Sequence, residues 1–131
     1  MRRYLSLLAV AAAVGGMSAL TAVPASALGS EALVCSISPG SGGTRPTCST
    51  HVSSGSYTVT FQVNNSSSNE TFAWTKPAAY PIVLGCTSTA IDCILRAPSG
   101  GDDQTISVSV VIRQGTASET LSGTAFIPNL V

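Results

Sequence analysis

Residues 104–128 read Gln-Thr-Ile-Ser-Val-Ser-Val-Val-Ile-Arg-Gln-Gly-Thr-Ala-Ser-Glu-Thr-Leu-Ser-Gly-Thr-Ala-Phe-Ile-Pro and form the most regular stretch of the chain. The first half alternates between apolar and polar side chains with the two-residue period of a strand buried on one face. Gln114-Gly115-Thr116 supplies a turn, and the alternation returns after it. The stretch therefore predicts a long β-hairpin. Its core-facing positions are Ile106, Val108, Val110, Ile112, Leu121, Ala125 and Ile127.

Residues 1–27 have the three parts of a secretory signal peptide. Two arginines give a positive start, an uncharged apolar stretch follows, and Ala25-Ser26-Ala27 is a small-residue cleavage site. An uncleaved membrane anchor is the alternative, but the paired glycines and many alanines of the apolar stretch favour cleavage. We expect secretion of residues 28–131 as a single domain, with no membrane attachment after cleavage.

Charges are few in residues 28–131, with four basic and six acidic side chains scattered along the sequence. Nucleic-acid and anionic-membrane surfaces need clustered lysine and arginine. We therefore expect no nucleic-acid partner. The abundant serine and threonine predict strand faces that are polar without being charged.

Four cysteines in a small secreted chain favour two disulfides. Of the three possible pairings we prefer Cys35–Cys48 and Cys86–Cys93, because each pair flanks a turn-rich segment that can fold back on itself. The first bond would staple an edge hairpin between the strand around Cys35 and a strand at residues 47–52. A zinc site is the alternative, but these spacings lack the close cysteine pairs of zinc knuckles. We expect no metal and no cofactor.

Other alternating runs predict short strands throughout, and no segment after the leader has a helical period. The clearest run places Tyr57, Val59, Phe61 and Val63 on one face of a strand. Seven or eight short strands separated by turns are typical of an all-β sandwich. A small Greek-key barrel is the alternative. The further strands are expected at residues 33–37, 47–52, 72–75, 82–84 and 91–95.

Four motifs follow one another in residues 57–128: Tyr-x-Val-x-Phe-x-Val, Phe-Ala-Trp, Gly-Cys-Thr-Ser-Thr, and a final hairpin ending Thr-Ala-Phe-Ile-Pro. This order resembles the small immunoglobulin-like or PKD-like sandwich domains secreted by actinobacteria. The resemblance implies an immunoglobulin-like β-sandwich of about seven to eight short strands with two local disulfides. The chain departs from true immunoglobulin domains because residues 104–131, where the sixth strand is expected, contain no cysteine. We therefore expect the inter-sheet disulfide to be absent.

The sequence contains no catalytic motif. His51 is the only histidine, and no serine lies in a Gly-x-Ser-x-Gly motif. The carboxylates are few and mostly expected in loops or at termini, so no glycosidase pair is predicted. Asp102 and Asp103 provide too few ligands for calcium and are expected in a solvated turn. We expect that the protein is not an enzyme.

Two alternative functions involve binding without catalysis. A secreted protease inhibitor would present an exposed loop braced by a disulfide, and Arg45 and Lys76 are candidate specificity residues, although each precedes a proline. Arg96 lacks a following proline but lies at the end of an expected strand. The chain also resembles the neocarzinostatin-like apoproteins, secreted sandwiches with two local disulfides, and that resemblance implies a small-ligand carrier. Their cysteine spacing and glycine-rich cleft segments have no clear match here.

The outward positions of the final hairpin carry two large apolar side chains. Phe126 lies beside Thr124 on one strand and Val111 lies outward on the other, so the two are predicted to form one apolar spot. Tyr80 is predicted to be exposed as well. Exposed apolar groups on a polar sheet favour a binding face. We therefore predict a secreted, monomeric, non-catalytic binding module whose partner is an extracellular protein or glycan, with these three residues at its surface.

Overall fold

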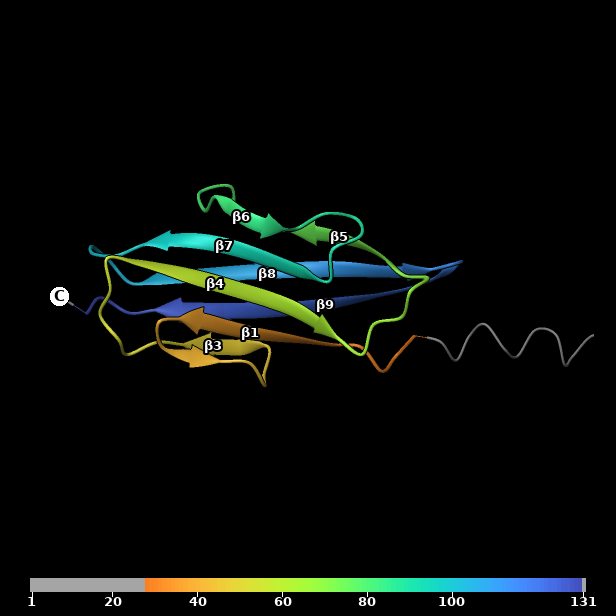
Figure 1. Ribbon diagram of the computed structural model, residues 1–131, viewed down its shortest axis with the longest axis horizontal. Coiled ribbons are helices and arrows are strands. Elements are labelled where there is room, and N and C mark those ends of the chain that lie inside the picture. The colour runs from red at the N-terminus through yellow and green to blue at the C-terminus, as the bar shows by residue number, and fades with distance from the viewer. Residues whose placement is uncertain (1–27, 131) are drawn as a thin grey trace, which may run out of the picture.

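The computed structural model describes residues 28–130. The expected signal peptide, residues 1–27, lies outside the described residues. The described part forms nine strands in two sheets that pack face to face, which confirms the all-β sandwich (Figure 1). Within it, no helix has the length and apolar character needed to cross a membrane.

The five-stranded sheet has the strand order β2-β1-β4-β7-β6, and all its neighbouring strands are antiparallel. β4 is its central strand and pairs with β1 on one side and β7 on the other. The strands of this sheet are β1 (Ala32–Ser38), β2 (Ser41–Gly42), β4 (Ser56–Asn64), β6 (Ile82–Gly85) and β7 (Asp92–Pro98).

The four-stranded sheet has the order β3-β9-β8-β5 and contains β3 (Thr47–Ser49), β5 (Thr71–Thr75), β8 (Gln104–Gln114) and β9 (Ala117–Ile127). β8 and β9 pair over their whole length, which confirms the predicted hairpin. Its turn is made by Gly115 and Thr116, and Gly115 has a φ of 60°. Glycine adopts this left-handed conformation without steric cost.

The core lies between the two sheets and is made by the alternate residues that the sequence pattern selects. Phe61, Leu95, Ile106 and Ile112 are the largest side chains that are completely buried. Each burial of this size removes enough apolar surface from water to stabilise the fold by about 1.5–3 kcal/mol. The core residues on the predicted inward positions are Leu33, Cys35, Ile37, Tyr57, Val59, Phe61, Val63, Phe72, Cys93, Leu95, Ile106, Val108, Val110, Ile112, Ala125 and Ile127.

The segment after β1 differs from the expected edge hairpin at residues 47–52. β1 forms its hairpin with β2, where Ser36 pairs with Gly42. β3 contains only Thr47–Ser49, belongs to the other sheet and runs parallel to β9. The prediction that β3 pairs with β1 is therefore wrong.

Backbone hydrogen bonds explain this change of sheet. Gly43 N donates to Cys35 O and Cys35 N donates to Arg45 O, each at 2.8 Å, so the chain first runs along β1. One residue later, Pro46 O accepts a bond from Thr124 N of β9 at 2.9 Å. The chain thus passes from one sheet to the other between Arg45 and Pro46.

Both predicted disulfide pairings are confirmed, Cys35–Cys48 and Cys86–Cys93. Cys35 lies in β1 and Cys48 in β3, so the first bond joins the two sheets covalently. This bond differs from the immunoglobulin-type disulfide between the second and sixth strands, because β4 and β8 contain no cysteine. The two cysteines are only 13 residues apart in sequence, and so short a separation did not indicate that they lie in different sheets. The Cys86–Cys93 bond connects the end of β6 to the start of β7 within one sheet, as expected.

Replacing both residues of the inter-sheet bond, Cys35→Ala with Cys48→Ala, is expected to lower the free energy of unfolding by about 3 kcal/mol. A cross-link over a loop of this length removes that much entropy from the unfolded chain. Guanidinium unfolding of the oxidised proteins, followed by circular dichroism, measures the difference. An unfolding midpoint equal to that of the parent protein would show that the bond does not stabilise the sandwich.

Candidate binding surfaces

The structure places the two predicted apolar residues of the final hairpin far apart. Phe126 pairs across the hairpin with Thr105, whereas Val111 pairs with Thr120. The two pairs are six positions apart along the hairpin, which is about 20 Å at the rise of an extended strand. Phe126 is 38% exposed and Val111 is half-buried. The prediction of one shared apolar spot is therefore wrong.

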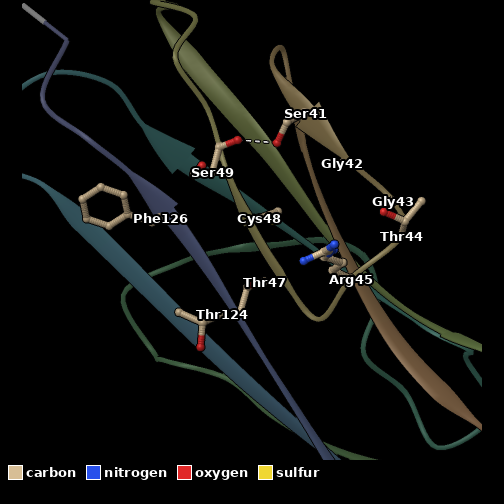
Figure 2. A pocket seen from close by; sticks show the side chains of 10 residues that line it. All are labelled: Ser41, Gly42, Gly43, Thr44, Arg45, Thr47, Cys48, Ser49, Thr124 and Phe126. Carbon is tan, nitrogen blue, oxygen red and sulfur yellow. Dashed lines mark hydrogen bonds between the residues drawn. The ribbon is translucent and has the colours of Figure 1, made fainter.

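Phe126 instead lines an open groove of about 540 Å³ at the β3 side of the four-stranded sheet (Figure 2). Figure 2 shows Phe126 and Arg45 toward opposite sides of the groove with Thr47 between them. An aromatic ring, a guanidinium and several hydroxyls can together stack against and hydrogen-bond a sugar or a short peptide. The hydroxyl groups of the lining belong to Ser41, Thr44, Thr47, Ser49 and Thr124.

Tyr80 is half-buried and packs against the core, so the prediction that it is exposed is wrong. Its carbonyl oxygen accepts a hydrogen bond from Lys76 Nζ at 2.7 Å. Lys76 Nζ also donates to Pro77 O at 3.0 Å. The lysine therefore closes its own loop, which leaves its ammonium group poorly placed to enter a protease pocket.

Arg45 is the other candidate specificity residue of an inhibitor. Its side chain is exposed, but its carbonyl oxygen accepts the Cys35 N–H at 2.8 Å. The peptide that a protease would have to engage is thus hydrogen-bonded to β1. His51, the only histidine, is exposed in the loop between β3 and β4.

The most exposed apolar strand is one that the sequence analysis did not select as a binding surface. Ile82, Val83 and Leu84 of β6 are 50%, 46% and 63% exposed. β6 is an edge strand, so no other strand of the described residues pairs with its outer side. Ile94 of β7 is half-buried and pairs with Leu84. We call Ile82, Val83, Leu84 and Ile94 the β6 patch.

Two features of β6 accompany the exposure of its three consecutive apolar side chains: it is an edge strand, and it contains a β-bulge. Ile82 pairs with Leu95 and Leu84 pairs with Ile94, so Val83 is an extra residue in the ladder. A bulge interrupts the two-residue alternation that would otherwise turn every second side chain toward the core. In the sequence, the run Ile82-Val83-Leu84 is typical of a buried strand. Only its place at the sheet edge reveals its exposure.

The loop of residues 86–93 fixes the end of β6. Gly85 has a φ of 77°, and a Cβ there would lie 2.2 Å from Asp92 O, so only glycine fits. Cys86 N donates to Asp92 O at 2.8 Å, and the Cys86–Cys93 bond closes the turn.

The same loop also connects the two sheets on the β6 side of the sandwich, where Figure 1 shows β6 close to β5. Phe72 N of β5 donates to Ser88 O at 3.0 Å. Trp74 Nε1, also of β5, donates to Ala90 O at 3.1 Å. The lone tryptophan, predicted to face inward, is half-buried, and its polar edge holds the loop that supports the β6 patch.

Substituting Trp74→Phe is expected to lower the free energy of unfolding by about 1–2 kcal/mol. The variant loses the hydrogen bond to Ala90 O and part of the buried ring. Thr75→Ala is the control, because Thr75 is exposed on the same strand, and it is expected to change stability by less than about 0.5 kcal/mol. Denaturant unfolding followed by circular dichroism compares them. Equal stability of the two variants would contradict a role of Trp74 in holding the loop.

No group of three or more histidine, cysteine, aspartate or glutamate side chains within residues 28–130 has an arrangement that could hold a metal ion. The sequence matches no protein-family model and no curated protein is significantly similar to it. The immunoglobulin-like resemblance is therefore judged on the fold alone. The β6 patch and the Phe126 groove are the surfaces on which a functional argument can rest.

Proposed function

We propose that this protein is a secreted, non-catalytic, immunoglobulin-like module that binds an extracellular protein through the β6 patch. The observation that carries the proposal is the run of three neighbouring apolar side chains, 46–63% exposed, on an edge strand. Exposed apolar residues that occur singly are normal on protein surfaces. Three such residues in succession on one edge strand are less common, and grouped exposed apolar side chains are typical of an interaction surface.

The strand order supports the immunoglobulin-like part of the proposal. In immunoglobulin constant domains, strands A, B, E and D form one sheet and strands C, F and G form the other. Here β1-β4-β7-β6 follows the order A-B-E-D, and β9-β8-β5 follows the order G-F-C. Trp74 lies on β5, the counterpart of strand C, where immunoglobulin domains carry their core tryptophan.

The two disulfides support secretion, because such bonds form and persist in oxidising compartments. A domain of this size has a small hydrophobic core, and the two disulfides add to the stability that the core provides. Both points agree with the leader expected at residues 1–27.

The chemistry of the β6 patch favours a protein partner over a glycan. All four side chains are aliphatic, so the patch offers neither an aromatic ring for stacking on a sugar nor a side-chain hydrogen-bond donor. Aliphatic groups gain most when another apolar surface covers them. The bulge at Val83 disturbs the edge ladder and so disfavours indiscriminate strand addition. The contact is accordingly made by side chains.

The groove at Phe126 supports a second candidate, binding of a glycan or a small polar ligand. It contains the aromatic ring, the Arg45 guanidinium and the hydroxyls that the β6 patch lacks. The two candidates use different sides of the molecule, since the groove adjoins β3 and the patch lies on β6 (Figure 1). Substitutions on each side therefore separate them.

The test uses the purified oxidised protein, immobilised and exposed to culture medium and cell-envelope extract of the source organism. Val83→Ser and Leu84→Ser are expected to reduce capture of a protein partner about tenfold or more, since each removes an aliphatic contact worth 1.5–3 kcal/mol when fully buried. Val52→Ser is the matched control, because Val52 is 45% exposed and Val83 is 46% exposed.

Capture by Val52→Ser and Phe126→Ala is expected to equal that of the parent protein. Equal loss in Val52→Ser, or undiminished capture by both β6 variants, would refute binding through the patch. Loss in Phe126→Ala alone would assign binding to the groove instead.

A further inference from the structure

The chain contains only three glutamates, and the fold gathers all of them at one end of the sandwich. It is the end at which the hairpin of β8 and β9 turns. Most acidic residues were expected in loops or at termini, but Glu119 lies within β9. Each glutamate lies two residues away from a core residue along the chain, and therefore on the same inward side of the strand. The pairs are Glu31 with Leu33, Glu70 with Phe72 and Glu119 with Leu121.

Glu31 and Glu70 are buried and Glu119 is half-buried, and the polar layer that they form has too few hydrogen-bond donors. Glu31 is 7% exposed and Glu70 is 6% exposed. Gly29 N donates to Glu31 Oε1 and Ser67 Oγ donates to Glu70 Oε2, both at 2.9 Å. An unpaired buried polar atom costs about 1–3 kcal/mol, and more if it is charged. The buried oxygens that lack a donor are Glu31 Oε2, Glu70 Oε1, Glu119 Oε1 and Gln114 Oε1.

Within residues 28–130, no lysine or arginine is among the groups that shift the pKa values of these carboxyls. The α-amino group that cleavage after Ala27 would give Leu28 is the cation nearest to Glu31 in sequence. Arg113 is the basic side chain nearest to Glu119 in sequence, but it pairs with Ser118 and Thr71 and therefore points to the outer face of the sheet, whereas Glu119 points inward. The remaining polar groups from the surrounding elements are neutral: Gln114 of β8, and Ser67 of the loop before β5. The donors that the glutamates need can come from protons on the carboxyl groups themselves.

The pKa values of the three carboxyl groups shift in the directions expected if Glu70 and Glu119 carry protons and Glu31 does not. Burial, together with the neighbouring Glu31, raises the pKa of Glu70 above its ordinary value of 4.5. The hydrogen bond to Glu31, together with burial, raises the pKa of Glu119. Burial also acts to raise the pKa of Glu31, but hydrogen bonds from Glu70, Glu119 and Gly29 N–H outweigh it and lower that pKa to about 2.

We propose that Glu31, Glu70 and Glu119 form a proton-dependent latch, in which protonated Glu70 and Glu119 donate hydrogen bonds to the central Glu31 carboxylate and hold the N-terminal segment on the sandwich. Two further contacts hold this segment: Asn65 Nδ2 donates to Ser30 O at 3.1 Å, and Leu28 packs against the core. When Glu70 and Glu119 release their protons to solvent, their donors disappear and the three carboxylates repel one another. The latch then opens and residues 28–31 detach.

The sign of the pH effect follows from the direction of each shift. A carboxyl group with a raised pKa stabilises the fold below 4.5, and this contribution is lost as the pH rises through its folded-state pKa. Glu31 has a lowered pKa, so its contribution is present above 4.5 and is lost as the pH falls to about 2. The combined contribution of the three glutamates to stability is therefore largest near pH 4.5 and decreases on both sides.

Thermal unfolding between pH 4.5 and pH 8 tests the latch. The Tm of the parent protein is expected to fall by several degrees over this range, and the Tm of the double variant Glu70→Gln with Glu119→Gln is expected to fall less. A glutamine amide donates a hydrogen bond without needing a proton. Asp102→Asn is the control, because Asp102 is an exposed carboxylate near the opposite end of β8, and its Tm should follow that of the parent protein.

Carbon-13 labelling of glutamate gives a direct second measurement, because the protein has only these three carboxyl signals of that type. Two signals are expected to titrate above pH 4.5 and one well below it. Titration of all three together near 4.5 would overturn the proposal, as would a double variant whose Tm falls as steeply as that of the parent protein. Addition of calcium chloride at pH 8 is expected to leave the Tm of the parent protein unchanged. A large rise in Tm would show that the glutamates bind a cation and would overturn the latch.

Discussion

The covalent link between Cys35 of β1 and Cys48 of β3 is the constraint on which the arrangement of the two sheets depends. It holds the place where the chain passes from one sheet to the other and sets β3 parallel to β9. The crossing also needs a small residue opposite it. A Cβ on Gly123 would lie 2.9 Å from Pro46 O and 3.1 Å from both Leu33 Cδ2 and Phe61 Cδ1, so a side chain there would push the crossing segment away.

The opposite side of the sandwich is closed in a different way. No disulfide joins the sheets there within the described residues; instead the loop of residues 86–93 receives hydrogen bonds from Phe72 and Trp74 of β5. One side is thus tied by a covalent bond and the other by a small number of hydrogen bonds. β6 is the edge strand on this second side, and its exposed apolar side chains form the proposed interaction surface.

Local alternation and turn chemistry were sufficient to predict the hairpin of β8 and β9, the strand with Tyr57 and Phe61, and both disulfide pairings. Pairing between distant strands was not predictable, because alternation gives the face of a residue but not its neighbour. The assignment of Cys48 to the second sheet depends on such pairing. The separation of Val111 from Phe126 follows from the register of the hairpin itself, and counting outward from the predicted turn would have shown it. The β6 patch was missed because an apolar run does not by itself show that its strand lies at a sheet edge. The glutamate layer could have been found by extending the inward alternation to Glu31, Glu70 and Glu119.

The central claim is that the sandwich is firmly closed on the Cys35–Cys48 side and more weakly closed on the β6 side. Amide hydrogen exchange followed by NMR tests it residue by residue, because exchange reports the free energy of local opening. We expect slow exchange at the Cys35 and Thr124 amides, which donate hydrogen bonds to the crossing segment, and much faster exchange at the Phe72 and Cys86 amides. Protection of Phe72 and Cys86 equal to that of Cys35 and Thr124 would contradict it.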